Sequence, residues 1–154
     1  MRIYLPSTVT ELRAATLEPR LVHAVTPGLR AALPDEDDEG LEYAAQLLAA
    51  DDSLDLLAED AAAPRRRLVV AADVPESDVE AVPAGEEHAP SLVRLTAPVA
   101  WEAVACAHVD EVAAGPEVEA ALAEDESALD RLAERDLLWY DVSELAGLAG
   151  PSPR

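Results

Sequence analysis

His108 and Asp110 are polar residues of the types that hold divalent metals or pass protons. They are separated by one residue within AVACAHVD, whose alternation is typical of a β-strand, so their side chains should share one face. A third group, Asp141 or His23, would complete a metal site or an acid–base site. His108, Asp110 and Asp141 are therefore the candidate catalytic residues. The structural alternative for His108 is a hydrogen-bonded, partly buried histidine.

The sequence lacks the usual spacings of metal, hydrolase and nucleotide sites. It contains no HExxH or CxxC motif, no serine in a GxSxG context, and no GxGxxG or Walker pattern. The single cysteine, Cys106, lies among alanines with only His108 nearby to lower its pKa, which favours a small buried thiol over a nucleophile. We expect neither a metal nor a cofactor.

Residues 34–46, PDEDDEGLEYAAQ, contain five consecutive acids followed by glycine. Counted from Asp35, the acids and the glycine fit the start of a calcium loop, but position 12 is Gln46, which cannot supply a bidentate carboxylate. Acids are also favourable at a helix N-terminus, where the dipole and free amides stabilise them. We favour a helix start, with a docking patch for a basic partner as the alternative. The candidate binding residues are Asp35, Asp37, Asp38, Glu39 and Glu42.

The aromatic pair in LLWYDV is the second candidate binding feature. Alternation sends Trp139 and Tyr140 to opposite faces of a strand. We expect Trp139 in the core. For Tyr140, with Tyr4, core packing is favoured, and a place in a binding groove is the alternative. The arginines at 65–67 form the basic cluster of the chain, either as a strand start paired with surface acids or as a small anion site.

The composition favours one acidic domain. The chain has 154 residues and a net charge of −21, from 32 acids against 11 arginines, and half of it is apolar. This size and apolar content can bury a core without disulfides or metals. The charge repels phosphate backbones, so we expect no nucleic-acid binding. It favours solubility, basic partners or bound cations, and the alternative is a general acidic bias of the proteome that only keeps the protein soluble. Because no segment resembles a signal peptide or a membrane span, and only one cysteine is present, we expect a cytoplasmic protein without membrane contact.

Hydrophobic periodicity predicts the element order β α β α α β β β α β. The expected strands cover residues 2–5, 21–26, 68–72, 91–96, 103–110 and 137–142, and the expected helices cover 8–17, 27–33, about 38–63 and 115–135. The third helix is either one helix with a possible kink or two helices in tandem. Thr26 before Pro27 favours a helix start, and the uninterrupted apolar run of 68–72 predicts a strand in the middle of the sheet. A flexible acidic loop is expected over 76–90 and a disordered tail over 149–154.

This order predicts an α+β fold in a single domain over residues 1–148. We expect a mostly antiparallel sheet with helices packed on one face. The nearest common architecture is ferredoxin-like, with the long helical segment as an insertion.

Five pieces, in this order, resemble a family of small actinobacterial proteins of unknown function: MRIYLPST, HAVTPGLRAALPDEDDEGLEYAA, RRRLVVAADVP, PVAWEAVACAHVDE and LLWYDVSEL. The resemblance extends from Met1 to about Leu145. It implies an actinobacterial, cytoplasmic source. It carries no assigned activity and transfers no catalytic residue.

Three functional hypotheses follow. The leading one is a non-enzymatic protein-interaction or regulatory module whose acidic surface, from Asp35 to Glu42, meets a basic protein. The alternative is a small-molecule-binding protein or enzyme with a polar site formed by His108, Asp110, Tyr140 and Asp141. A homo-oligomer closed through exposed strand edges is the third.

Overall fold

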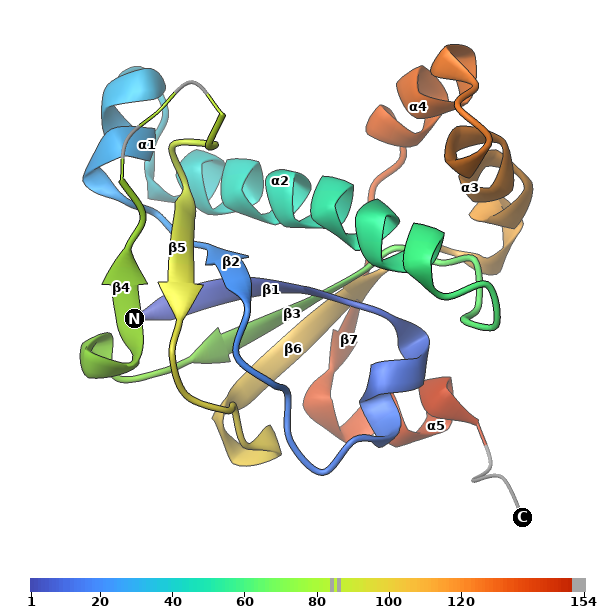
Figure 1. Cartoon of the computed structure of the whole chain (residues 1–154), viewed down its shortest axis with the longest axis horizontal. Helices are drawn as coiled ribbons and strands as arrows, with labels where there is room; N and C mark the ends of the chain where they lie inside the picture. The colour runs from blue at the N-terminus through green and yellow to red at the C-terminus, as the bar shows by residue number, and fades with distance from the viewer. Residues whose placement is uncertain (84, 86, 151–154) are drawn as a thin grey trace.

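The computed structural model describes residues 1–83, 85 and 87–150, which form one antiparallel sheet with helices around it (Figure 1). The strands are β1 (Arg2–Ser7), β2 (Leu21–His23), β3 (Leu68–Asp73), β4 (Val79–Ala81), β5 (Leu92–Leu95), β6 (Val104–Val109) and β7 (Leu138–Asp141). Their order across the sheet is β4-β5-β2-β1-β3-β6-β7, so β4 and β7 are its edges. The predicted α+β class is confirmed, whereas the ferredoxin-like arrangement remains a prediction.

β3 lies in the middle of the sheet because its side chains are apolar on both faces. Residues 68–72 are all buried, and the strand pairs with β1 on one side and β6 on the other. A strand covered on both faces needs a continuous apolar run rather than alternation. The predicted central position of this strand is confirmed.

Helices cover both faces of the sheet rather than the one expected. α2 (Asp38–Glu59) crosses one face and buries its Leu41 side against β1 and β3, with α1 (Pro27–Ala32) at its start. On the opposite face, α5 (Leu145–Ala149) packs with the 3-10 helix Val9–Arg13 and completes the larger core (Figure 1). The second face needs this cover because β1, β3 and β6 are apolar on both sides.

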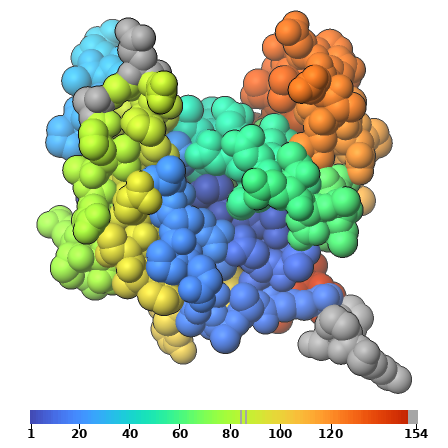
Figure 2. All heavy atoms as spheres, viewed as in Figure 1, coloured from blue at the N-terminus to red at the C-terminus, as the bar shows by residue number. Residues whose placement is uncertain are grey.

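The helix expected over 115–135 is two helices, α3 (Gly115–Leu122) and α4 (Glu126–Ala133). The chain breaks at Glu124, which has a left-handed φ of 67°, and Asp125 then caps α4 by accepting backbone amides. Both helices bury apolar residues against the C-terminal part of α2, so the apolar period continues across the break. In Figure 2 this pair stands apart from the α1 and β4–β5 end, with α2 lower between them.

α2 is one continuous helix of 22 residues, although polar residues interrupt its apolar pattern. Ser53 lies on its buried side, where its hydroxyl donates to the Ser7 carbonyl at 2.8 Å and accepts from the Leu68 amide at 3.1 Å. A buried hydroxyl with both partners satisfied does not need to leave the core. Of the two forms considered from the sequence, the structure therefore has the single helix and not the tandem pair.

Two segments of the N-terminal half were assigned wrongly. The helix expected over residues 8–17 is the short 3-10 helix Val9–Arg13, because the side chain of Thr8 makes no cap hydrogen bond and the chain turns extended at Ala14. Leu17 then forms a bridge with Val99. The strand expected over 21–26 ends at His23.

The segment 76–90, expected as a loop, contains regular structure. Glu76–Asp78 form a 3-10 turn, and β4 pairs antiparallel with β5. Three residues are too short to give a recognisable period, which explains the error. Residues 84 and 86 of this segment, and 151–154 of the expected tail, lie outside the described residues.

A bulge in β6 changes which of its side chains share a face. The pairing with β3 passes from Ala71 opposite Cys106 to Ala72 opposite Val104, so Ala105 is the extra residue. Val104 therefore joins Ala107 in the larger core rather than the face of Cys106. Strict alternation would place Val104 and Cys106 on one face, and the bulge prevents this.

Candidate functional site

Asp110 is held in a closed ion pair and is not available to a site with His108. Its carboxylate accepts from Arg67 Nε and Nη2, both at 2.8 Å, and from the Arg67 amide at 2.9 Å, and both side chains are almost fully buried. Arg67 also donates to the Leu132 carbonyl of α4. This bidentate pair fixes the start of β3 to the end of β6 and to α4. It is structural.

The other two arginines of the cluster also have protein partners. Arg66 Nε donates to the Asp110 carbonyl at 2.8 Å, and Arg65 Nη1 donates to the Leu57 carbonyl at the end of α2 at 2.9 Å. Both groups are half-buried. The arrangement matches a strand start tied to its surroundings, and it gives the anion-site hypothesis no support.

Asp141 caps the turn that follows β7. It accepts from the Ser143 amide at 3.0 Å and hydroxyl at 2.6 Å, while Glu144 accepts from the Asp141 amide, which completes a capping box. The hydrogen bonds from Ser143 hold the pKa of Asp141 below its usual range. The cap of this turn is thus Asp141.

Tyr140 lies on the opposite face of the sheet from His108. It is paired with Ala107 and packs against the larger core. The structure therefore separates the four residues of the enzyme hypothesis. Asp110 is locked in its ion pair, Tyr140 faces away, and His108 shares its face only with Asp141.

His108 instead joins one side of α2 in a groove of about 260 Å³, which we call the Trp139 groove. α2 contributes Glu39, Glu42, Tyr43 and Gln46, whose spacings of three, four and seven residues place them on one side of the helix. The groove thus unites two features that the sequence suggested separately, the acidic helix start and His108.

The strands supply the rest of the Trp139 groove. β1 contributes Arg2 and Tyr4, β6 contributes Cys106 and His108, and β7 contributes Trp139. Tyr43 bridges the two sides, since its hydroxyl donates to Asp136, just before β7, at 2.9 Å.

Aromatic side chains are concentrated in this groove. The chain has two tryptophans and three tyrosines, five in all, and three of them, Tyr4, Tyr43 and Trp139, line it. Trp139 is 60 % exposed and Tyr43 47 % exposed. The core position expected for Trp139 is wrong, because α2 packs on β1, β2 and β3 and leaves the face of edge strand β7 open.

The tyrosine, cysteine and histidine that the strands contribute to the groove stay uncharged near neutral pH. Burial, with the nearby charge of Glu42, raises the pKa of Tyr4 to about 12. Burial also raises the pKa of the Cys106 thiol, and burial with the charge of Arg2 lowers the pKa of His108. A protonated thiol is not a nucleophile, which agrees with the sequence-based interpretation of Cys106.

The charge of the groove is therefore set by its two glutamates and Arg2. Arg2 is already paired with Asp73 through two hydrogen bonds of 2.7 and 2.9 Å. Glu39 and Glu42 are exposed. The groove is consequently acidic and aromatic, a combination that suits the recognition of a cation.

The remaining acids of the predicted patch serve the start of α2. Asp37 is the N-cap and accepts from the Gly40 amide at 2.8 Å, while Asp38 accepts from Arg30 Nη1 at 2.9 Å. Asp35 is exposed ahead of the helix. The helix start is confirmed, with Asp37 rather than Asp35 or Asp38 as the cap.

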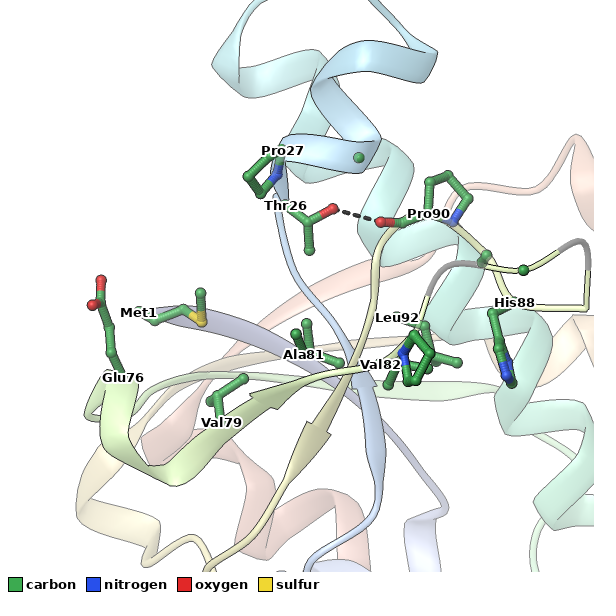
Figure 3. Close-up of a pocket in the computed structure, with 15 residues that line it drawn as sticks. Met1, Thr26, Pro27, Glu76, Val79, Ala81, Val82, His88, Pro90 and Leu92 are labelled. Carbon is green, nitrogen blue, oxygen red and sulfur yellow. Dashed lines mark hydrogen bonds between the residues drawn. The ribbon is translucent and has the colours of Figure 1, made fainter.

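A second concavity, the β4 pocket, lies at the other edge of the sheet and has a volume of about 650 Å³ (Figure 3). Its walls are mainly apolar and include Met1, Val79 and Leu92, and Thr26 at the start of α1 donates to the Pro90 carbonyl across one side. Glu76 and His88 are its charged or titratable lining groups among the described residues. No local sequence pattern indicates this pocket.

A serine–histidine–aspartate chain lies beneath this end of the sheet. His23 Nδ1 is 2.6 Å from the Ser91 hydroxyl, and His23 Nε2 is 2.6 Å from the Asp52 carboxylate. Ser91 is fully buried and Asp52 half-exposed, so the serine cannot reach a substrate as a nucleophile must. These hydrogen bonds, which we call the His23 chain, join β2 and the start of β5 to α2. No local motif reveals it, because the paired residues are 29 and 68 positions apart.

Among the described ranges, no group of three or more His, Cys, Asp or Glu side chains is arranged to hold a metal ion. None of the helices in that part of the chain combines the length and apolar character needed to cross a membrane.

The fold and the Trp139 groove define a small α+β protein with an acidic, aromatic surface site. Over residues 1–149 the chain matches a family described as a family of unknown function (DUF6912), and it belongs to that family. No curated protein and no solved structure matches the chain significantly. The resemblance to a family of unknown function is thus confirmed. The actinobacterial source that we expected is not shown by this match.

Proposed function

We propose that the protein is a non-enzymatic interaction module that binds a basic segment of a partner protein in the Trp139 groove. The observation that carries the proposal is the gathering of three of the five aromatic side chains beside Glu39 and Glu42. This composition supports recognition of a lysine or arginine side chain, which can contact an aromatic face and pair with a carboxylate together.

The charge of the whole chain supports the same kind of partner. A net charge of −21 attracts basic surfaces over long range and accelerates their association. The groove would then supply the specific contact at the end of that approach. An enzyme centred on His108 has less support, because Asp110 and Tyr140 lie outside the groove and Cys106 stays a protonated thiol. Binding is therefore the function that the geometry supports best.

The composition, the single cysteine and the resemblance described above support an actinobacterial cytoplasm as the place of action. A basic protein of that compartment is the partner class we propose.

Fluorescence anisotropy with a labelled peptide of alternating arginine and valine tests the proposal at about 150 mM salt, where long-range attraction is screened. The double substitution Glu39→Gln with Glu42→Gln should weaken binding roughly five- to thirtyfold, the value of two contacts of about 0.5–1 kcal/mol each.

The matched control is Glu102→Gln with Asp130→Asn, which removes the same charge from exposed positions outside the groove. It should change the affinity less than about twofold. Equal losses in the two variants would show that only net charge matters, and absence of binding to the unsubstituted protein would end the proposal.

A further inference from the structure

The two edges of the sheet differ in how well they are protected against strand addition. β4 has only three residues and is flanked by Pro75 and Pro83. Short strands and prolines are the usual protection of an edge. β7 is four residues long, and the sequence from 117 to 150 contains no proline. The β7 edge is therefore the accessible one among the described strands.

The hydrogen-bond pattern of β7 determines which backbone groups face outward. The Asp141 amide donates to Glu144, not to β6, so Asp141 and Cys106 form a non-hydrogen-bonded pair. Such pairs alternate with hydrogen-bonded ones along antiparallel strands. The next non-hydrogen-bonded pair is Trp139 with His108, so the amide and carbonyl of Trp139 point away from β6 to the open edge.

The side chain of Trp139 faces the groove while its backbone faces the edge. It shares the α2 face with His108, its partner across β6. In an added antiparallel strand, the residue opposite Trp139 would place its own side chain on this same face. That side chain would lie beside the groove that contains Glu39 and Glu42.

An open strand edge can pair with a second copy of the chain or with a segment of another protein, and charge distinguishes these two alternatives. A second copy of the chain would bring another net charge of −21 to the edge, with Asp136 and Asp141 flanking β7 on both copies. Like charges across paired strands are destabilising. A basic extended segment is complementary to the same surface.

We infer that the basic segment binds as an antiparallel β-strand added to β7, with a basic side chain opposite Trp139 directed into the groove. This inference rests on the proposed function and specifies the form in which the partner binds. Main-chain hydrogen bonds to Trp139 would contribute affinity, and alternate side chains would contribute specificity.

The test uses the same arginine–valine peptide with N-methyl groups on either its arginines or its valines. An arginine opposite Trp139 must direct its amide and carbonyl to β7, whereas the neighbouring valines direct theirs away. N-methylation of the arginines should therefore weaken binding by about tenfold or more, and N-methylation of the valines by less than about twofold.

Two substitutions at one position give a second measurement. Trp139→Ala and Trp139→Pro both remove the aromatic ring, but only proline also removes the outward amide, and it leaves the β6 ladder intact. The proline variant should bind the peptide several-fold more weakly than the alanine variant, with an unchanged circular dichroism spectrum for both.

The outcomes separate the inference from the proposed function. Binding that is equally sensitive to both methylation patterns would overturn strand addition while leaving the groove as a binding site. Absence of peptide binding would overturn both. A dimer of the protein alone that Trp139→Pro abolishes would assign the edge to a second copy and also overturn the inference.

Discussion

The two ends of the sheet have the same antiparallel geometry but different surfaces. At the β7 end, exposed aromatics and carboxylates line a polar groove beside an edge without prolines. At the β4 end, a larger apolar pocket lies beside a three-residue edge strand between prolines. The two edges thus differ in strand length, in proline placement and in how far α2 reaches over them (Figure 1).

The two ends are also fixed by different buried polar groups. Arg67 and Asp110 form a fully buried ion pair near the β7 end, whereas the His23 chain near the β4 end reaches solvent through Asp52. A buried charge that loses its partner is costlier than a neutral group that loses a hydrogen bond. The β7 end should therefore be the more sensitive to single substitutions in its buried polar groups.

Asp110→Ala should give the largest loss of stability, because it leaves the Arg67 guanidinium buried without its partner. We expect the free energy of unfolding to fall by about 3–5 kcal/mol in urea denaturation.

Asp73→Ala, which breaks the exposed pair with Arg2, is the control and should cost less than about 1 kcal/mol. A comparable loss in the two variants would contradict the structural role assigned to the buried pair.

Ser91→Ala should give the next largest loss of stability, since it removes the partner of His23 Nδ1 at the buried end of the His23 chain. A loss of about 1–3 kcal/mol is expected from urea denaturation. Asp52→Asn should cost less, because its side chain is 41 % exposed and water can replace the contact. A larger loss of stability for Asp52→Asn than for Ser91→Ala would contradict the greater importance assigned to the buried hydrogen bond of His23.

His108 should make stability depend on pH. Its pKa is lowered by burial in the folded protein, so below the ordinary value of 6.5 the unfolded chain binds more protons. The free energy of unfolding should therefore decrease as the pH falls through 6.5, and this contribution should level off below the lowered pKa of His108 in the folded protein.

His108→Gln should lack this part of the decrease, as measured by urea denaturation at each pH. Identical pH profiles for His108→Gln and the unsubstituted protein would show that His108 does not titrate differently on folding.

Glu42→Gln should have the smallest effect on stability, within about 0.5 kcal/mol, because Glu42 is exposed in the groove. The same variant should bind the peptide more weakly, which separates recognition from folding. A stability loss above about 1 kcal/mol would assign Glu42 a structural role instead.

Local patterns in the sequence predicted the elements that depend on local chemistry. Thr26 before Pro27 predicted the start of α1, where the threonine hydroxyl accepts from the Leu29 amide. The apolar run of β3 predicted its central place. In both cases, neighbouring residues alone determine the structure.

The groove and the His23 chain depend on contacts between distant segments. Trp139 is exposed because β7 is an edge strand that α2 does not cover, and sheet order is not encoded in a local period. The bulge at Ala105 shifts the alternation that a sequence pattern assumes to be regular. The acids at the start of α2 were recognised, but their meeting with His108 and Trp139 required the path of the helix.

Backbone amide chemical shifts, followed while the arginine–valine peptide is added, show where on the protein the peptide binds. We expect the largest changes on Trp139, His108 and Tyr43 at the β7 end, while Val79 and Leu92 at the β4 end stay unchanged. Changes centred on the β4 pocket, or spread evenly over the acidic surface, would rule out the Trp139 groove as the binding site.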